Sequence, residues 1–195
     1  MGTRAQQAAQ TELELKAAAI RVFERVGYLN AKITDITAEA GRATGSFYKH
    51  FPSKEKLLEA LLAGLLAEGD ASAELAGHLD DFRDRAAVRW HVAVYWAFYR
   101  DHRAVMSALQ QAATVDEEFA RRSREMLEPD LRHIADHLAG LRPPGGPLVG
   151  ASFFTATLSS VAAAWFADPD PAAGETETIE ALTTFLHTGL GGQNP

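Results

Sequence analysis

Residues 33–54 read Ile-Thr-Asp-Ile-Thr-Ala-Glu-Ala-Gly-Arg-Ala-Thr-Gly-Ser-Phe-Tyr-Lys-His-Phe-Pro-Ser-Lys, and this stretch decides the fold. Its pattern predicts a short helix, a tight turn at Gly41, a second short helix, and a third helix that starts after Pro52. A helix-turn-helix presents its second helix to the major groove of duplex DNA. The sequence therefore predicts DNA contact as one half of the function.

The small residues of this stretch have separate expected roles. Thr34 is expected to cap the first short helix, and Gly41 lets the chain reverse without a Cβ clash. Gly45 and Ser46 begin the second short helix and are small enough for the backbone to approach bases and phosphates closely.

The donors that follow are suited to phosphate oxygens. Tyr48, Lys49 and His50 carry hydrogen-bond donors, and Lys54 adds a positive charge beside the Ser53 cap of the next helix. The predicted DNA contacts are Thr34, Arg42, Ala43, Thr44, Gly45, Ser46, Tyr48, Lys49, His50 and Lys54.

The rest of the chain is expected to be helical. Apolar residues at helical spacing predict a helix over 11–26 that ends at Gly27, whereas residues 1–10 lack such a stripe and are predicted to form a mobile arm. No sustained period-2 alternation follows, so no strand is predicted. Further helices are predicted over about 79–101, 102–113, 115–141, 147–167 and 175–190.

Composition places the chain among globular proteins. It has 195 residues, of which 47% are hydrophobic and 23% are charged, and it has no cysteine, which excludes disulfides and thiolate metal sites. The first residues lack a basic patch followed by an apolar run, so no secretory signal is predicted and a cytoplasmic location is expected.

The net charge of −7 is unevenly distributed. Residues 1–56 hold nine basic and six acidic side chains, and residues 57–195 hold ten basic and twenty acidic ones. All lysines lie in the first segment. Phosphate contact needs local positive charge rather than a basic protein, so the +3 segment is the expected DNA-binding part.

These motifs together resemble the tetracycline-repressor (TetR) family of bacterial transcription regulators. The resemblance rests on residues 33–41, on Thr-Gly-Ser-Phe-Tyr-Lys-His-Phe at 44–51, and on Ser-Lys-Glu-Lys-Leu-Leu at 53–58. It implies an all-α protein with a helix-turn-helix DNA-binding domain at 1–52 and a helical-bundle domain for ligand binding and dimerisation at 53–195. It also implies that Tyr48 contacts phosphate.

Two positions depart from the family pattern. Arg42 stands where a small apolar residue, often valine, is usual. Its guanidinium could contact DNA, which we favour, or its stem could pack while the charge stays in solvent. Ala43 lacks the hydroxyl that many relatives have before the second helix, so Thr44 is an alternative cap.

Large side chains concentrate at 90–106 and point to the sensing function. A filled aromatic core would also explain them, but buried Tyr, His and Trp side chains need polar partners, which a bound ligand supplies. With the pocket that the resemblance implies, we expect a mostly apolar or aromatic effector. The predicted lining is Trp90, His91, Tyr95, Phe98, Tyr99, His102, Met106, Phe119, Met126, Phe153, Phe154 and Thr157.

Residues 148–167 contain no charged side chain, and their length would fit a membrane span. Several serines and threonines and the absence of flanking basic clusters argue against that interpretation. Small residues there instead favour a self-complementary interface. In the resembled family the last two helices form a four-helix bundle between subunits, here 148–167 and 175–190 with a stripe of Ile179, Leu182, Phe185 and Leu186.

Catalytic and metal sites are not predicted. His133 and His137 are four residues apart with Asp136 between them, but two histidines without a third fixed ligand favour a solvent-facing pair. Nucleophile and phosphate-loop motifs are absent from the sequence. No enzyme activity, cofactor or metal is expected.

The sequence thus predicts a homodimeric regulator that binds a palindromic operator and is released by a small molecule, most simply a repressor. An activator or a corepressor-dependent regulator fits the same residues. A helical small-molecule-binding protein or small enzyme without DNA contact is a further alternative, although it gives no reason for the 33–54 pattern.

Overall fold

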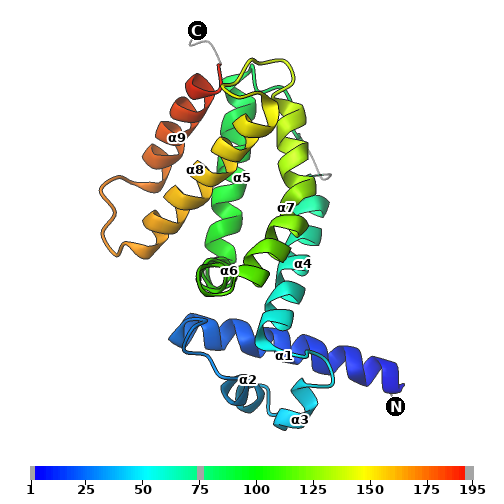
Figure 1. Cartoon of the computed structure of the whole chain (residues 1–195). Helices are drawn as coiled ribbons and strands as arrows, with labels where there is room; N and C mark the ends of the chain where they lie inside the picture. Colours follow the sequence, from blue (N-terminus) through cyan, green and yellow to red (C-terminus); the bar gives the residue numbers. More distant parts are fainter. Residues whose placement is uncertain (1–2, 74–76, 192–195) are drawn as a thin grey trace. The chain divides into compact units, whose positions relative to one another are not determined.

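The computed structural model describes residues 3–73 and 77–191, and every regular element in them is helical. The helices are α1 (Arg4–Val26), α2 (Ile33–Glu39), α3 (Thr44–Phe47), α4 (Lys54–Ala73), α5 (Arg85–Asp101), α6 (Arg103–Val115), α7 (Glu117–His137), α8 (Pro147–Ala167) and α9 (Glu175–Gly189) (Figure 1). The predicted all-α fold is confirmed.

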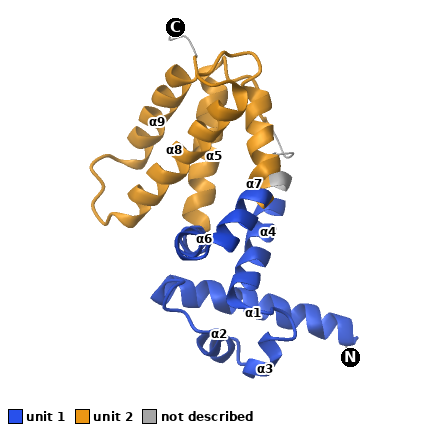
Figure 2. Ribbon diagram, viewed as in Figure 1, with its two compact units in different colours: residues 1–68, 103–125 blue, residues 69–102, 126–195 orange. Residues whose placement is uncertain are grey.

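The chain forms two compact units (Figure 2). Unit 1 comprises residues 1–68 and 103–125, and unit 2 comprises residues 69–102 and 126–195. The predicted functional boundary after residue 52 is not an edge of either unit, because unit 1 continues along α4 and includes α6. The boundary of a functional domain need not coincide with the boundary of a compact unit. The assignment of DNA binding to residues 1–52 therefore stays a prediction.

The amino-terminal helix starts earlier than its apolar stripe. Thr3 Oγ1 accepts a hydrogen bond from the Gln6 amide at 3.3 Å, and Gln6 Oε1 accepts one from the Thr3 amide at 2.6 Å. This capping box satisfies two backbone donors that the first turn would otherwise leave free. The predicted mobile arm is therefore wrong for residues 4–10, and residues 1–2 lie outside the described part.

Unit 1 is organised around one apolar core. Leu15, Val22, Ile36, Phe47 and Leu57 are all fully buried and come from four helices. Burying a side chain of this kind stabilises a fold by about 1.5–3 kcal/mol before conformational entropy is subtracted. The contacts of α1 with α2 and α6, and of α2 with α3, hold the short helices in place.

Unit 2 is organised around α5, on which both α8 and α9 pack. Val88, Val92 and Trp96 of α5 are fully buried, and Leu182 and Leu186 of α9 are nearly so. Two predicted boundaries shift. The helix expected over 79–101 begins at Arg85, because the Asp84 carboxylate caps it by accepting from the Ala86 amide at 2.8 Å. The helix expected over 115–141 spans only Glu117–His137.

Helix α8 has the predicted bounds and an unusual composition. Among the described helices it alone has the length and apolar character of a membrane span, with a mean hydropathy of 1.4 and 28% of that window buried. Gly150, Ala151, Phe154, Leu158 and Ala162 form its buried face. The opposite face of α8 is exposed in the single chain. An interface with a second copy of the chain would need such an exposed face.

Candidate nucleic-acid interface and effector region

The turn between α2 and α3 has the geometry that the sequence predicts. Gly41 has φ = +63°, a conformation that L side chains rarely adopt, and the Arg42 amide donates to the Thr37 carbonyl at 2.8 Å. Phe47 is fully buried and Phe51 is 4% exposed, and their rings lie 5.7 Å apart. These contacts fix α3 on the core of unit 1.

The caps of the two short helices differ from prediction. Lys32 rather than Thr34 is the N-cap of α2, because the Asp35 carboxylate accepts from the Lys32 amide at 3.2 Å. Ala43 is the N-cap of α3, so Thr44 is the first helical residue and not the cap. Helix α3 ends at Phe47, and hydrogen-bonded turns rather than helix continue to Phe51.

The outer side of α3 is exposed to solvent. The exposed residues there are Arg42, Ala43, Thr44, Gly45, Tyr48 and Lys49, whereas Ser46 and His50 are half-buried; Thr34 on α2 is also exposed. Tyr48 is 56% exposed. The structure thus brings eight of the ten predicted DNA contacts, at positions 42–46 and 48–50, to one turn and helix, whereas Thr34 lies on α2 and Lys54 at the start of α4.

Gly45 is the most informative of these residues. A Cβ atom built at this position would meet nothing within 4 Å, and its φ is not positive. Neither backbone conformation nor internal packing therefore requires a glycine. A glycine that the fold does not need is consistent with close approach of an external backbone.

Arg42 already has a partner within unit 1. Its Nε donates to Glu14 Oε2 at 3.0 Å, and Nη2 contacts the same oxygen. This contact, together with that of Gln10, lowers the pKa of the Glu14 carboxyl. Both side chains remain partly exposed, so the pair fastens the turn to α1 while the guanidinium stays accessible.

Lys54 serves the interior of unit 1 more than its surface. Its ammonium donates to the carbonyls of Tyr28 at 2.7 Å and Ala31 at 2.9 Å, and it lies 4.1 Å from the centre of the Tyr28 ring. Partial burial lowers the pKa of Lys54. Two of the three hydrogens of the Lys54 ammonium are therefore used within unit 1. The sequence did not reveal these contacts, and they compete with the predicted phosphate contact.

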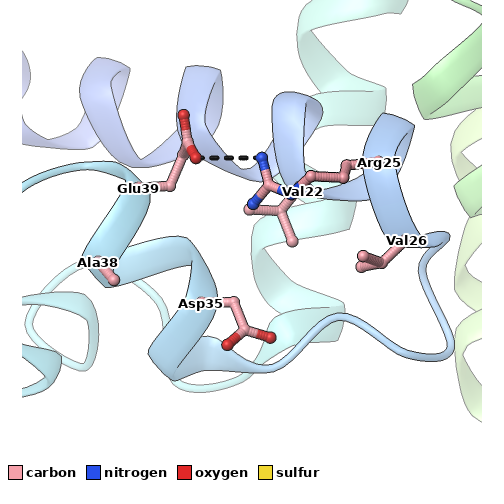
Figure 3. Close-up of a pocket in the computed structure, with 6 residues that line it drawn as sticks. All are labelled: Val22, Arg25, Val26, Asp35, Ala38 and Glu39. Carbon is pink, nitrogen blue, oxygen red and sulfur yellow. Dashed lines mark hydrogen bonds and ion pairs between the residues drawn. The ribbon is translucent and has the colours of Figure 1, made fainter.

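A surface hollow of about 540 Å³ lies between α1 and α2 (Figure 3). Its lining is Val22, Arg25, Val26, Asp35, Ala38 and Glu39. Glu39 joins Arg25 at 3.2 Å and Arg21 at 2.7 Å. This open, ion-paired hollow belongs to unit 1 and contains none of the residues predicted to line an effector pocket.

The predicted effector residues are divided between the units. Met106 and Phe119 belong to unit 1, where Phe119 is fully buried, and the other ten belong to unit 2. Phe154 is buried against Phe82, with ring centres 5.2 Å apart. Phe153 is 54% exposed on the opposite side of α8, so its predicted inward orientation is wrong.

Two polar aromatic groups of unit 2 stand out. The Tyr95 hydroxyl is hydrogen-bonded to Ser159, and burial raises the pKa of Tyr95 to about 12. Trp96 is fully buried between Trp165 and Phe166, and its indole Nε1 has no partner among the described residues. A buried donor of this kind calls for a water or ligand acceptor, which makes Trp96 a candidate that sequence reasoning missed.

The histidines of unit 2 form a cluster that the sequence did not predict. His78 Nε2 lies 3.3 Å from His91 Nε2 and 3.1 Å from His137 Nε2. His137 is only 8% exposed, so its expected solvent-facing position is wrong, although His133 is exposed. Burial lowers the pKa of His91 to about 4, and burial with the neighbouring histidines lowers that of His137 to about 4.

The residues of the predicted interface stripe on α9 do not all face the same side of the helix. Leu182 and Leu186 are buried within the chain, Ile179 is half-buried, and Phe185 is 66% exposed. Because α9 packs strongly on α5, the leucines contribute to the core of one chain, and the stripe is not a single outward face. The large exposed apolar residues of α8 and α9 are Leu148, Val149, Phe153 and Phe185.

Comparisons with known proteins agree on one family. Residues 15–61 match the family described as bacterial regulatory proteins, tetR family. The transcriptional repressor NicS of Pseudomonas putida is 30% identical over 143 residues, which cover 73% of this chain and 65% of NicS, slightly less than two thirds of that relative. The transcriptional regulator EthR of Mycobacterium tuberculosis is 24% identical over 190 residues, or 94% of this chain and 88% of EthR.

Solved structures share the fold over nearly the full length. A tetR-family regulatory protein from Rhodococcus RHA1 superimposes with a TM-score of 0.73 at 20% identity, covering 94% of this chain and 98% of that one. FadR from Bacillus subtilis, solved in complex with stearoyl-CoA, gives a TM-score of 0.70 at 16% identity, covering 91% and 98%. The curated relatives are named transcriptional regulators and the family is not enzymatic. This chain belongs to the tetR family of bacterial regulatory proteins.

Proposed function

We propose that this chain represses transcription by binding a palindromic operator as a homodimer, and that a small, mostly apolar or aromatic effector releases it. The observation that carries the DNA-binding part is Gly45. Gly45 lies exposed in α3, close in sequence to Tyr48 and Lys49, and a Cβ atom at its position would meet no atom of the chain within 4 Å. Such a position suits close contact with a phosphate backbone.

Dimer formation is supported by the exposed residues of α8 and α9. Leu148, Val149, Phe153 and Phe185 each expose between 41% and 66% of their surface in the single chain. Exposed apolar groups of this size favour association, and two-fold symmetry would match the two halves of a palindrome.

The effector is proposed to bind among the aromatic residues of unit 2. The buried Trp96 N–H and the Tyr95 hydroxyl would supply polar contacts within an otherwise apolar lining. Release from DNA requires only that the effector binds the DNA-free conformer more tightly than the DNA-bound one. An activator, or a regulator that needs its ligand to bind DNA, would use the same residues with the opposite preference.

Transmission to the reading helices is proposed to involve contacts within unit 1. Helix α6 contacts α1 through an Arg103–Glu24 ion pair at 3.0 Å. Gln111 of α6 also accepts, through Oε1, from the Leu29 amide at 3.3 Å in the turn that follows α1. Movement of α6 would therefore act on α1 and, through the shared core, on α2 and α3. The proposed location is the cytoplasm, where operator DNA is found.

Binding to the DNA upstream of the gene for this chain and of its neighbours tests the proposal. Titration of labelled duplexes is expected to show one saturable complex that unlabelled scrambled duplex displaces poorly. Equal displacement by matched and scrambled duplexes would contradict sequence-specific regulation. Adding candidate effectors to the complex then separates release from ligand-dependent binding.

A further inference from the structure

Three histidines that are distant in sequence converge in unit 2. His78 lies on the segment before α5, His91 on α5, and His137 at the end of α7. One nitrogen from each lies within 4.8 Å of the other two. We propose that these three side chains bind a divalent transition metal of the zinc class, with a fourth coordination position open to water or another ligand.

The distances suit a tetrahedral ion. Zinc–nitrogen bonds of about 2.05 Å at tetrahedral angles place neighbouring nitrogens about 3.3 Å apart. The two short contacts of His78 Nε2, at 3.3 Å and 3.1 Å, agree with that edge length. The third pair of nitrogens, from His91 and His137, lies within 4.8 Å.

The orientation of His91 is set as in known metal sites. Its Nδ1 lies 3.0 Å from the Ala87 carbonyl oxygen, and because a carbonyl can only accept, Nδ1 carries the hydrogen. In the neutral ring the lone pair is then on Nε2, which faces His78 and His137. A backbone carbonyl that fixes the tautomer of a histidine ligand is a recurring outer contact of metal sites.

Hydrogen bonds among the three rings cannot satisfy this arrangement. With the His91 lone pair on Nε2, the contact to His78 needs a hydrogen on His78 Nε2. That single hydrogen would also have to serve the 3.1 Å contact with His137 Nε2. A cation that receives a lone pair from each ring satisfies all three nitrogens at once.

Surrounding contacts hold the rings before any ion binds. Phe82 is fully buried, with ring centres 4.8 Å from His91 and 5.3 Å from His137, and its amide donates to the His137 carbonyl at 3.4 Å. Trp90 lies 5.2 Å from His78. This apolar enclosure and the nitrogen donors favour zinc, nickel, cobalt or copper over magnesium or calcium, which prefer oxygen.

Metal binding to tag-free protein, first stripped with a chelator, tests the proposal. Titration with Zn²⁺ against a chromophoric competitor is expected to show one ion per chain, and Mg²⁺ is expected not to compete. His78→Ala removes one ligand at a half-buried position and is expected to weaken Zn²⁺ binding at least tenfold. His133→Ala is the matched control, since His133 stacks on His78 at 5.4 Å but is outside the triad, and it is expected to bind Zn²⁺ normally.

The visible spectrum of Co²⁺-loaded wild-type protein gives a second measurement that needs no variant. An intense four-coordinate spectrum is expected, and Zn²⁺ should abolish it by displacement. Absence of stoichiometric binding, or Zn²⁺ affinity unchanged in His78→Ala, would overturn the proposal. Equal loss in both variants would also overturn it, because His133, which lies outside the triad, would then matter for the ion as much as His78 does. None of these results depends on DNA binding.

Discussion

At the scale of single residues, the exposed helix-turn-helix face separates into groups that the fold needs and groups that it does not. Gly41 has a positive φ and is needed for the turn, whereas Gly45 has neither that conformation nor a crowded Cβ position. Lys54 is bound to two carbonyls, whereas Lys49 has no ion pair among the described residues. These contrasts separate folding from DNA binding.

Gly45→Ala is expected to keep the fold and weaken operator binding at least tenfold. The added methyl group meets no atom of the chain but would stand between α3 and DNA. Melting temperature and duplex affinity should be measured together. Gly41→Ala is the matched control and should lower stability by about 1–2 kcal/mol, because its φ is +63°. Unchanged DNA affinity in Gly45→Ala would contradict the proposed interface.

The two lysines are expected to behave differently on truncation. Lys49→Ala should leave the unfolding free energy unchanged and reduce the salt dependence of DNA binding by about one unit of slope. Lys54→Ala should lower the unfolding free energy by about 1–2 kcal/mol, because the Tyr28 and Ala31 carbonyls lose their donor. Urea unfolding and a salt series of DNA titrations measure both effects. If Lys54→Ala instead reduced the salt dependence of DNA binding and left the unfolding free energy unchanged, Lys54 would be a phosphate contact.

At the scale of helices, the sequence patterns predict which helices exist better than they predict the residues at which each helix begins and ends. Capping contacts determine these ends. The capping box of Thr3 and Gln6 starts α1 at Arg4, earlier in the chain than predicted, and the Asp84 cap starts α5 at Arg85, later than predicted. Local periodicity also could not tell which side of α9 would face α5, so Leu182 and Leu186 were assigned to a dimer interface. Packing between distant helices determines that choice.

The start of α4 is expected to show acid sensitivity through Glu55. Burial alone would raise the pKa of this carboxyl, but hydrogen bonds from Ser53 and Tyr28 outweigh it, and the pKa lies below its ordinary value of 4.5. A lowered folded-state pKa contributes stability above 4.5, which is lost as the pH falls through the folded-state pKa. The wild type should therefore be more stable than Glu55→Gln near neutral pH, and this difference should shrink in acid. A difference that is constant across that range in urea unfolding would refute this account.

The exposed side of α8 and α9 is expected to control association. Phe153→Asp together with Phe185→Asp should convert dimers to monomers, because the two phenylalanines are 54% and 66% exposed in the single chain. Leu127→Asp on α7 is the control, since Leu127 is similarly exposed at 42%. Sedimentation velocity separates the species. Dimers that persist in the double variant, or that dissociate only in the control, would exclude this interface.

At the scale of the whole molecule, the sequence predicted a DNA-binding part and left the site of effector binding largely open. The motif at 33–54 and the confinement of lysine to residues 1–56 are local features, so they were visible in the chain. The cluster of His78, His91 and His137 and the buried Trp96 N–H arise from residues brought together by folding. The spacing of residues along the sequence does not show that these side chains meet in the folded chain.

The central claim is that two copies of this chain read an inverted repeat, and selection from a pool of random duplexes tests it most directly. The wild-type protein should enrich a palindrome whose half-sites are about one helical turn apart, or a multiple of that. Gly45→Ala, at the same concentration and salt, should enrich it far less. Enrichment of no sequence above the starting pool, by a protein shown to be folded and dimeric, would contradict the account.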